Sequence, residues 1–515
     1  MILNLFTSRP DHPLADAKEL KRALSGLPPD NAFKAVDEIA GWLESLANAE
    51  GFRVDQLFDV ARQLDDAVQP HLKRLARDYF ASPRLPRAEE KRLWSANFGY
   101  WGLLAEVCER CLGALGDKGK GGEKGGDKGA DLLRGSLPLV AARTIAALGQ
   151  QVKWMEFRYG PVETNLWQRL GRAYLAAEAG KAAQKPVQLY PNAPGSTTVA
   201  GEYLHVLAFH ASSTDSLMPL EIELADRLIA HFQSDFVFSA DSHGRGVYWV
   251  DAAKAQAPMR MAKLPSAMTP TLRFFAPGSV PQALDDLIRH VERGEVPADL
   301  HLGGQYQAKT VLPVLRHLAL YWAPQPPLRE HPRHNVKTRL AVLNGFDDSF
   351  TVFAGEVARI GKERAAESWV VENVSLGGFG AAIDNLRGDW LKVGSLISMQ
   401  PEGGDNWVLG IVRRFSRDSE TQASVGIQTL ARQAVSVELI PRSSTYTVGS
   451  GVPGIRLPED RAPGEVRLVL PVATFDIRES LEYLSGERRY LLTPIELVES
   501  GADFEVARYR ELVES

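Results

Sequence analysis

The chain has 515 residues, with 59 Lys and Arg against 64 Asp and Glu, a formal net charge of −5 and an isoelectric point near 6.2. This charge balance excludes a histone-like polycation, and a hydrophobic content of 44% is enough for about three domains that each bury a core. The sequence has no apolar run of about 18 residues and does not begin with a signal-peptide pattern. We therefore expect a cytoplasmic protein without a membrane span. Two cysteines are too few for a disulfide framework.

Residues 1–115 are predicted to form a helical domain. An apolar stripe at spacings of three and four indicates a first amphipathic helix, for which Asp30 or Asn31 is the N-cap. A second stripe runs from Leu57 to Tyr79, and we expect Pro70 to interrupt that helix. These stripes are typical of core packing. The first stripe consists of Phe33, Val36, Ile39, Leu43 and Leu46.

Residues 116–130 are predicted to be a flexible linker. The segment from Gly116 to Gly129 reads GDKGKGGEKGGDKG and contains no apolar residue. A lysine-bearing tail of this kind could bind nucleic acid, but its acidic residues nearly balance the lysines. The charge pattern therefore favours a linker, and we expect no DNA partner.

Residues 131–323 are predicted to be mostly helical with some strands. Trp167, Leu170, Gly171 and Tyr174 resemble the W-x2-L-G-x2-Y signature of the first helix of a tetratricopeptide repeat. The match covers one helix without a 34-residue recurrence, so an isolated bundle helix is the better interpretation. Further on, the glycine-rich residues 241–246 indicate a turn between two strands.

A proline-rich break at Ala323–Pro327 precedes a change in pattern to period two. Residues 324–436 are predicted to form a β-barrel, and residues 437–515 a β-rich C-terminal extension of it. The predicted barrel strands are 339–343, 350–353, 369–373, 380–383, 395–399, 407–414 and 423–430. The predicted strands of the extension are 466–470, 474–477 and 490–493.

Two motifs stand at the start of this β-rich part. Arg329 and Arg333 form an R-x3-R pair before the first predicted strand, and Asn373, Ser375 and Gly378 form N-x-S-x-x-G after a later one. Together with the ordered strands behind them, they resemble the two signature motifs of the PilZ domain. The resemblance implies a six-stranded antiparallel barrel that binds cyclic di-GMP, a bacterial second messenger. The fold class is then multidomain α+β, with a helical N-terminal region before a PilZ-like barrel.

The residue types suit such a ligand. The guanidinium groups of Arg329 and Arg333 can grip a guanine edge or a phosphate with two hydrogen bonds and can stack on a purine. Asn373 and Ser375 are alternate strand residues, so both side chains face the same way. Gly378 allows close approach of a base and can adopt the positive φ of a tight turn. We expect these residues to bind the nucleotide, with the arginine arm becoming ordered around it.

Three departures from the family pattern bear on this prediction. Asn373 stands where many members have Asp, and an amide cannot accept two guanine hydrogen bonds as a carboxylate does. Leu328 stands where an extra arginine is common, which affects ligand stoichiometry. The segment 344–368 is longer than the pattern requires and is predicted to be an inserted hairpin or loop.

Other candidate sites carry less weight. Cys108 and Cys111 form a C-x-x-C without a second pair, which favours core packing on a helix over zinc or redox chemistry. The four histidines His301, His317, His331 and His334 are scattered rather than spaced for a metal, although the last two flank Arg333. No catalytic motif is present, so we expect a non-enzymatic receptor and adaptor for signal transduction, with a protein partner bound through the helical region. The alternative is a ligand-independent scaffold whose degenerate PilZ domain leaves partner docking to that region.

Overall fold

The computed structural model divides the chain into two compact units. It describes residues 10–81, 85–116, 128–193, 195–241, 246–325, 332–357, 366–442, 451–458 and 463–514. The helical unit comprises residues 1–158, 162–214 and 219–327, and the barrel unit comprises residues 159–161, 215–218 and 328–515. The predicted class is confirmed: a mostly helical region precedes a β-rich part, within a multidomain α+β protein.

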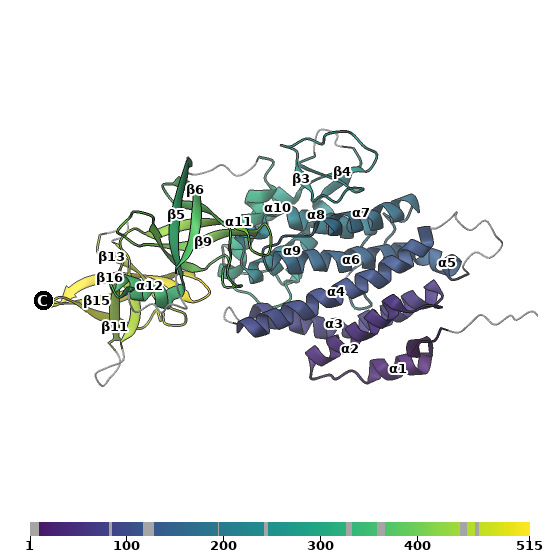
Figure 1. The fold of residues 1–515 in the computed structure, drawn as a ribbon, viewed down its shortest axis with the longest axis horizontal. Helices are drawn as coiled ribbons and strands as arrows, with labels where there is room; N and C mark the ends of the chain where they lie inside the picture. Colours follow the sequence, from purple (N-terminus) through teal and green to yellow (C-terminus); the bar gives the residue numbers. More distant parts are fainter. Residues whose placement is uncertain are drawn as a thin grey trace, which may run out of the picture. The chain divides into compact units, whose positions relative to one another are not determined.

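The helical unit is built from long helices that pack side by side, as Figure 1 shows for α2, α3, α4 and α6. Their bounds are α1 Ala17–Ser25, α2 Ala32–Asn48, α3 Val54–Ala81, α4 Arg87–Gly116, α5 Lys128–Leu133, α6 Leu137–Glu156, α7 Thr164–Ala179, α8 Val199–Ala211, α9 Pro219–Phe232, α10 Val280–Val291 and α11 Ala308–Trp322. Short 3₁₀ turns are η1 Pro13–Ala15, η2 Arg134–Ser136, η3 Thr214–Ser216, η4 Gln233–Asp235 and η5 Ala298–Leu300.

The first two predicted helices correspond to α2 and α3. Asn31 caps α2, because its side-chain oxygen accepts a hydrogen bond from the Lys34 amide at 3.0 Å. The expected interruption at Pro70 is wrong, since α3 continues through it. A proline inside a helix costs about 3 kcal/mol or more. Buried side chains on both sides of Pro70, including Val68 and Leu72, offset this cost by packing against the bundle.

The end of the predicted linker also differs from expectation, because Lys128 and Gly129 begin α5. Residues 117–127 lie outside the described part of the chain. The stretch Lys128–Glu156 is long and apolar enough to cross a membrane by length and composition. Within it, however, α6 packs against α4, α7 and α8 and is buried on most of its circumference. Its apolar character is that of a core helix.

A buried ion pair ties three of these helices together. Arg143 of α6 lies 2.9 Å from the carboxylate of Asp65 on α3, and both side chains are almost completely buried. The Tyr100 hydroxyl of α4 donates to the same carboxylate at 2.7 Å. Burial raises the pKa of Asp65, while Arg143 acts in the opposite direction. Buried charges are tolerated when they are paired in this way, and removing Arg143 would leave Asp65 without a cationic partner.

A four-stranded sheet completes the helical unit, with the order β1–β4–β2–β3. Its strands are β1 Val237–Ser239, β2 Tyr248–Asp251, β3 Met259–Arg260 and β4 Leu272–Ala276. The two strands expected on either side of residues 241–246 are β1 and β2, and both pair with β4 and not with each other. Residues 242–245 of the expected turn lie outside the described part of the chain. The central strand β4 is buried along its whole length, which favours this order over an isolated hairpin.

The tetratricopeptide-like segment forms α7, which packs in the bundle beside α6 and α8. Gly171, the small residue of the motif, does not face a neighbouring repeat helix, as the motif implies. A Cβ on Gly171 would lie 1.8 Å from the carbonyl oxygen of Ala252, which directly follows β2. Gly171 therefore lets the sheet, and not a second repeat helix, approach α7. Tyr174 adds a ring contact with Phe238 at 5.7 Å on β1.

The barrel unit contains two closed antiparallel barrels of six strands each. The strands of the first barrel are β5 His334–Asn344, β6 Glu367–Ser375, β7 Gly378–Ile383, β8 Leu396–Pro401, β9 Val408–Arg417 and β10 Ala423–Ala431. Their order around the barrel is β10–β7–β6–β5–β8–β9, and pairing of β9 with β10 closes it. Closure leaves no exposed sheet edge.

The C-terminal residues form a second barrel, so the expectation that they extend the first one is wrong. Its strands are β11 Val435–Pro441, β12 Val452–Arg456, β13 Glu465–Pro471, β14 Leu481–Ser485, β15 Arg488–Ser500 and β16 Phe504–Glu514. The order is β11–β12–β13–β16–β15–β14, closed by β11 and β14. The predicted strand at 474–477 is not formed, because these residues lie in the turns that connect β13 to β14.

A helix between β5 and β6 joins the two barrels. Residues 350–353, predicted as a strand, belong to this helix, α12 Gly345–Phe353, so the expected hairpin or loop after β5 begins as a helix. Residues 358–365 of that segment lie outside the described part of the chain. The Phe346 amide donates to Asp503 of the second barrel at 2.7 Å, and the Ser398 and Ser349 hydroxyls bond at 2.8 Å on the first-barrel side. One apolar cluster spans the join, with buried members Phe346, Leu396, Leu409, Ile411, Ala431, Ile455, Leu457, Val469, Phe504 and Val506.

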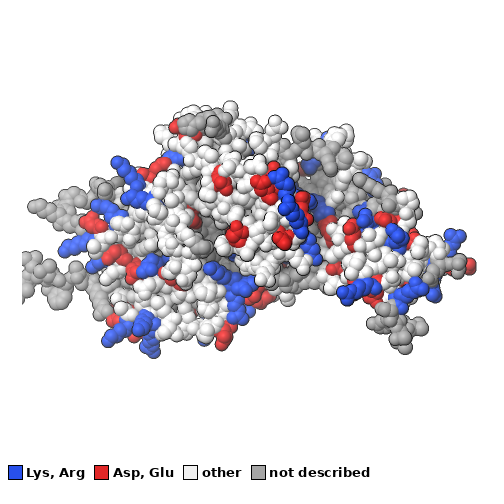
Figure 2. Space-filling model, turned by 180° about the vertical axis from the view of Figure 1, so that it is seen from behind, with Lys and Arg blue, Asp and Glu red and all other residues white. Residues whose placement is uncertain are grey.

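Charged side chains of both signs are scattered over the surface, with uncharged residues between them. On the face drawn in Figure 2, basic and acidic side chains of the described residues lie interspersed. This mixture agrees with the small net charge of −5. A surface of this kind favours solubility over a long-range attraction to polyanions.

The close approach at Gly171 yields a stability prediction. Replacing Gly171 with Ala places a methyl group against the rigid backbone of Ala252, so we expect a loss of about 1–3 kcal/mol in the free energy of unfolding. Gly113→Ala is the control, since Gly113 lies exposed in α4 with open space around its Cβ position, and Ala there should stabilise by roughly 0.5–1 kcal/mol. Thermal and urea unfolding monitored by circular dichroism would check both changes. Equal stability of the two variants would contradict the packing argument.

Candidate functional site

A hollow of about 530 Å³ lies on the wall of the first barrel. It is lined by residues of β6, β7, β9 and β10, together with the residue before β5. The hollow gathers four of the five residues selected from the sequence: Arg333, Asn373, Ser375 and Gly378. Arg329, the fifth, lies outside the described residues, as do Leu328 and His331.

Arg333 is positioned by the strand that follows it. In β5, His334 pairs with Val374 and Asn335 pairs with Asn373, so the residue before β5 stands beside the end of β6. The Arg333 side chain is exposed and, within the described part of the chain, has no carboxylate partner. Its guanidinium group is therefore available to an anion from solvent.

Asn373 and Ser375 line the same hollow from β6, as expected for alternate residues of a strand. The Asn373 amide lies over the neighbouring strand, where a Cβ on Gly380 would come within 2.6 Å of its Oδ1. The Ser375 hydroxyl makes a long contact of 3.4 Å with the Gly378 carbonyl oxygen. Both side chains are half-buried, so they keep hydrogen-bonding capacity toward the hollow.

Glycines form the floor of the hollow. Gly378 and Gly380 on β7 face Gln428 and Gly426 on β10 in the strand register. Gly378 does not use the positive φ that a glycine can adopt, because this residue lies in the extended β7. Its lack of a side chain serves a close backbone approach instead, since a Cβ there would lie 1.8 Å from the Ile427 carbonyl oxygen. The floor is consequently smooth backbone that a flat group could cover.

Two further arginines of the hollow, Arg413 and Arg414, were not selected from the sequence. They are consecutive in β9 and would normally point to opposite faces. In the pairing with β10, Gly426 is opposite Arg414 and Ile427 is opposite Val412, so Arg413 is the extra residue of a β-bulge. The bulge lets both side chains reach one hollow. Hydrophobic alternation alone gives no signal for such a bulge.

Both of these arginines already have carboxylate partners. Arg413 forms a two-point ion pair with Glu499 on β15 of the second barrel, one contact being 2.7 Å, and donates from Nε to Gln428 Oε1 at 2.7 Å. Arg414 pairs with Asp215, whose segment 215–218 belongs to the barrel unit. The described part of the hollow thus contains three guanidinium groups: that of Arg333, which has no carboxylate partner, and those of Arg413 and Arg414, which do. It also contains an amide, a hydroxyl and exposed backbone. This set can bind an anion that carries flat polar rings.

The described cysteines are buried in a helix, and two described side chains of α11 are held by one serine. Cys108 and Cys111 are free thiols buried in α4, which confirms core packing. Burial raises the pKa of the Cys111 thiol to about 12 and that of Cys108 well above its usual value, so both stay protonated. His317 and Trp322 of α11 are held by Ser212. Among the described residues, no group of three potential ligands could hold a metal ion.

One family is found by comparison with known proteins. Residues 18–242 match the family described as cyclic-di-GMP receptor FimW, N-terminal domain. The matched segment runs from α1 past β1, lies in the helical unit apart from two short segments, and covers less than half of the chain. No curated protein matches the sequence.

The glycine floor gives a prediction that does not depend on any ligand. Gly378→Ala should lower the stability of the first barrel by about 1–3 kcal/mol, because the new methyl group meets the backbone of Ile427. Gly380→Ala should cost less than about 1 kcal/mol, because the Asn373 side chain that it meets can rotate away. Comparing the unfolding midpoints of the two variants checks this order. A larger loss for Gly380→Ala would show that the Asn373 side chain is held more firmly than the Ile427 backbone.

Proposed function

We propose that the chain is a cyclic di-GMP receptor of the PilZ type, with the hollow on the first barrel as its nucleotide site. The observation that carries this proposal is the gathering of Arg333, Asn373, Ser375 and Gly378 around one hollow. The family match in residues 18–242 is independent support, since it concerns a cyclic-di-GMP receptor and covers none of these residues. It favours a binding role over an enzymatic one.

The ligand chemistry fits the hollow in three respects. Arg333 can take a phosphate or the O6 and N7 edge of a guanine with two hydrogen bonds. Asn373 and Ser375 offer an acceptor and a donor for the base edge. Gly378 and Gly380 line the hollow with backbone alone, which a flat base can cover. Arg329 would complete the R-x3-R motif from the other end.

A titration with cyclic di-GMP is the direct test. The wild-type chain should bind, and Arg333→Ala should lose about 1–3 kcal/mol of binding free energy, roughly five- to 150-fold in affinity, because a two-point guanidinium contact is removed. Isothermal titration calorimetry measures this loss. Arg339→Ala is the matched control, since Arg339 is exposed on β5, the strand that follows Arg333, and does not line the hollow. Absence of binding by the wild-type chain would refute the receptor proposal.

Arg413 could transmit nucleotide binding from the first barrel to the second. This arginine lines the hollow and also holds Glu499 of the second barrel. A phosphate in the hollow would compete with that carboxylate for the guanidinium group, so nucleotide binding would loosen one tie between the barrels. The changed second barrel, or the helical unit as an adaptor surface, would then alter the affinity for a protein partner.

Competition of this kind predicts the effect of Glu499→Gln. Removing the carboxylate frees Arg413 for the ligand, so the affinity for cyclic di-GMP should rise by up to about fivefold, the equivalent of the roughly 0.2–1 kcal/mol of a partly exposed ion pair. Calorimetry at low and high salt measures this change. Glu496→Gln is the control on the same strand, because Glu496 pairs with Arg508 away from the hollow. Weaker binding by Glu499→Gln would mean that Glu499 orients Arg413 instead of competing for it.

A ligand-independent scaffold is the second candidate. The observation that favours it is the pairing of Arg413 and Arg414 with carboxylates, which leaves one described guanidinium of the hollow without such a partner. In that case the barrels would be structural and a protein partner would bind the helical unit. The calorimetric titration separates the two functions, since a scaffold gives no heat and no shift in unfolding temperature at saturating nucleotide.

A further inference from the structure

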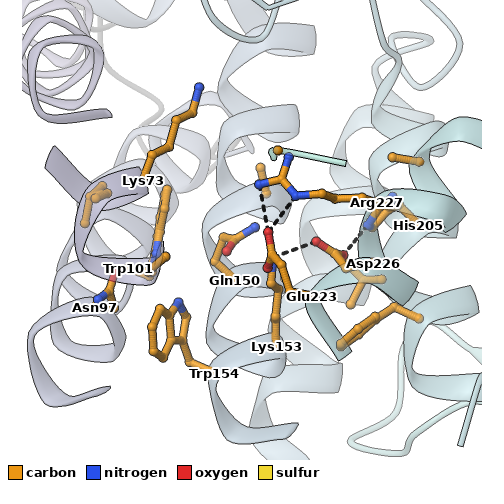
Figure 3. Close-up of a pocket in the computed structure, with 18 of the residues that line it drawn as sticks. Lys73, Asn97, Trp101, Gln150, Lys153, Trp154, His205, Glu223, Asp226 and Arg227 are labelled. Carbon is orange, nitrogen blue, oxygen red and sulfur yellow. Dashed lines mark hydrogen bonds and ion pairs between the residues drawn. The ribbon is translucent and has the colours of Figure 1, made fainter. Parts of the chain in front are cut away.

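We infer that the helical unit contains a second binding site, for a small anion that carries an aromatic ring. The site is an open cavity of about 530 Å³ lined by α3, α4, α6, α8, α9 and the segment that follows η5 (Figure 3). It shares no residue with the hollow on the first barrel. The inference is therefore independent of the proposed nucleotide site.

The inner wall of the cavity is a closed network of charges. Lys153 of α6 lies 2.5 Å from Glu223 and 2.7 Å from Asp226, both on α9. Asp226 also contacts His205 of α8 at 2.7 Å, and Glu223 accepts from Arg227 at 2.7 Å. Each carboxylate thus has two cationic or hydrogen-bonding partners, as Figure 3 shows by dashed lines. The network leaves no negative charge uncompensated.

Two further cations stand at the cavity without such compensation. Lys73 and Arg77 are one turn apart on α3, so their side chains lie on the same side of the helix. Both are exposed, and neither forms an ion pair with any described residue. The remaining acid of the lining, Glu202, accepts a hydrogen bond from Thr197, and burial raises its pKa, which favours its neutral form. The excess charge of the cavity is therefore positive, and an anion is the complementary ligand.

Arg227, a third cationic side chain of the cavity, is held in place by the loop that contains Gly303. Gly303 has a positive φ of 80°, and a Cβ there would lie 2.6 Å from the Arg227 guanidinium carbon. The loop backbone and Glu223 therefore hold Arg227 from two sides. Burial raises the pKa of the neighbouring Tyr306, so its hydroxyl remains a hydrogen-bond donor at neutral pH.

Aromatic side chains make up much of the remaining wall. Trp101 and Trp154 lie on one side of the cavity in Figure 3, and Tyr190, Phe209 and Tyr306 also line it. Large rings beside an open space favour a flat apolar or aromatic group, which can stack on them. Cations together with rings indicate a ligand of the nucleoside monophosphate type, in which a phosphate would meet Lys73 and Arg77 and a base would meet the rings.

The test uses the full-length chain carrying Arg333→Ala, so that the barrel hollow contributes little. Calorimetry is run with each of the four nucleoside 5′-monophosphates, with the free nucleosides and with inorganic phosphate. We expect at least one monophosphate to bind, and to bind at least tenfold more tightly than its nucleoside or phosphate. The double change Lys73→Gln and Arg77→Gln should weaken it at least tenfold. Lys91→Gln, at an exposed lysine of α4 outside the cavity, should leave it unchanged.

Each other outcome overturns the inference. If no monophosphate binds, the cavity is a solvent-filled gap around a structural ion network. If phosphate alone binds as tightly as the monophosphates, the rings take no part. If the double variant binds the monophosphate normally while its circular dichroism is unchanged, Lys73 and Arg77 do not bind the phosphate group. Because Lys73 and Arg77 are exposed, loss of folding would not obscure the result.

Discussion

The apolar cluster between the two barrels is the constraint on which the barrel unit depends. It takes side chains from β8, β9 and β10 on one side and from β12, β13 and β16 on the other, with Phe346 of α12 between them. These groups pack against one another across both barrels, and burial of apolar surface is the main stabilising term in folding. The wall of the first barrel that carries β9 is thereby fixed against the second barrel, and the Arg413–Glu499 ion pair forms across that fixed join.

The candidate nucleotide site owes its composition to irregular pairing as much as to sequence motifs. The register of β6 with β7 shifts at Glu372, and that of β9 with β10 shifts at Arg413. Such bulges bend a strand and redirect side chains without opening the barrel. They bring the Asn373 and Ser375 pair of one strand and the adjacent arginines of another to one place, above a floor of glycines.

Much of this architecture could be predicted from local patterns. The helix around Asn31 and most strands of the first barrel follow from periodicity and capping. The pattern failed where tertiary packing decides: Pro70 stays inside α3, and the apolar run 350–353 is helical because it packs against both barrels. Closure of a second barrel depends on long-range pairing that no local pattern encodes. Arg413 was missed for the same reason, since a bulge is a property of two strands together.

The connection from β10 to β11 spans only residues 432–434. Because the link is so short and the apolar cluster is shared, the two barrels fold as one unit. Neither barrel can be replaced by another domain on its own. A fragment cut after the first barrel would present Leu396, Leu409 and Ile411 to water and would invite self-association. Evolutionary shuffling of this module, and any recombinant dissection of it, therefore has to carry both barrels as an indivisible pair.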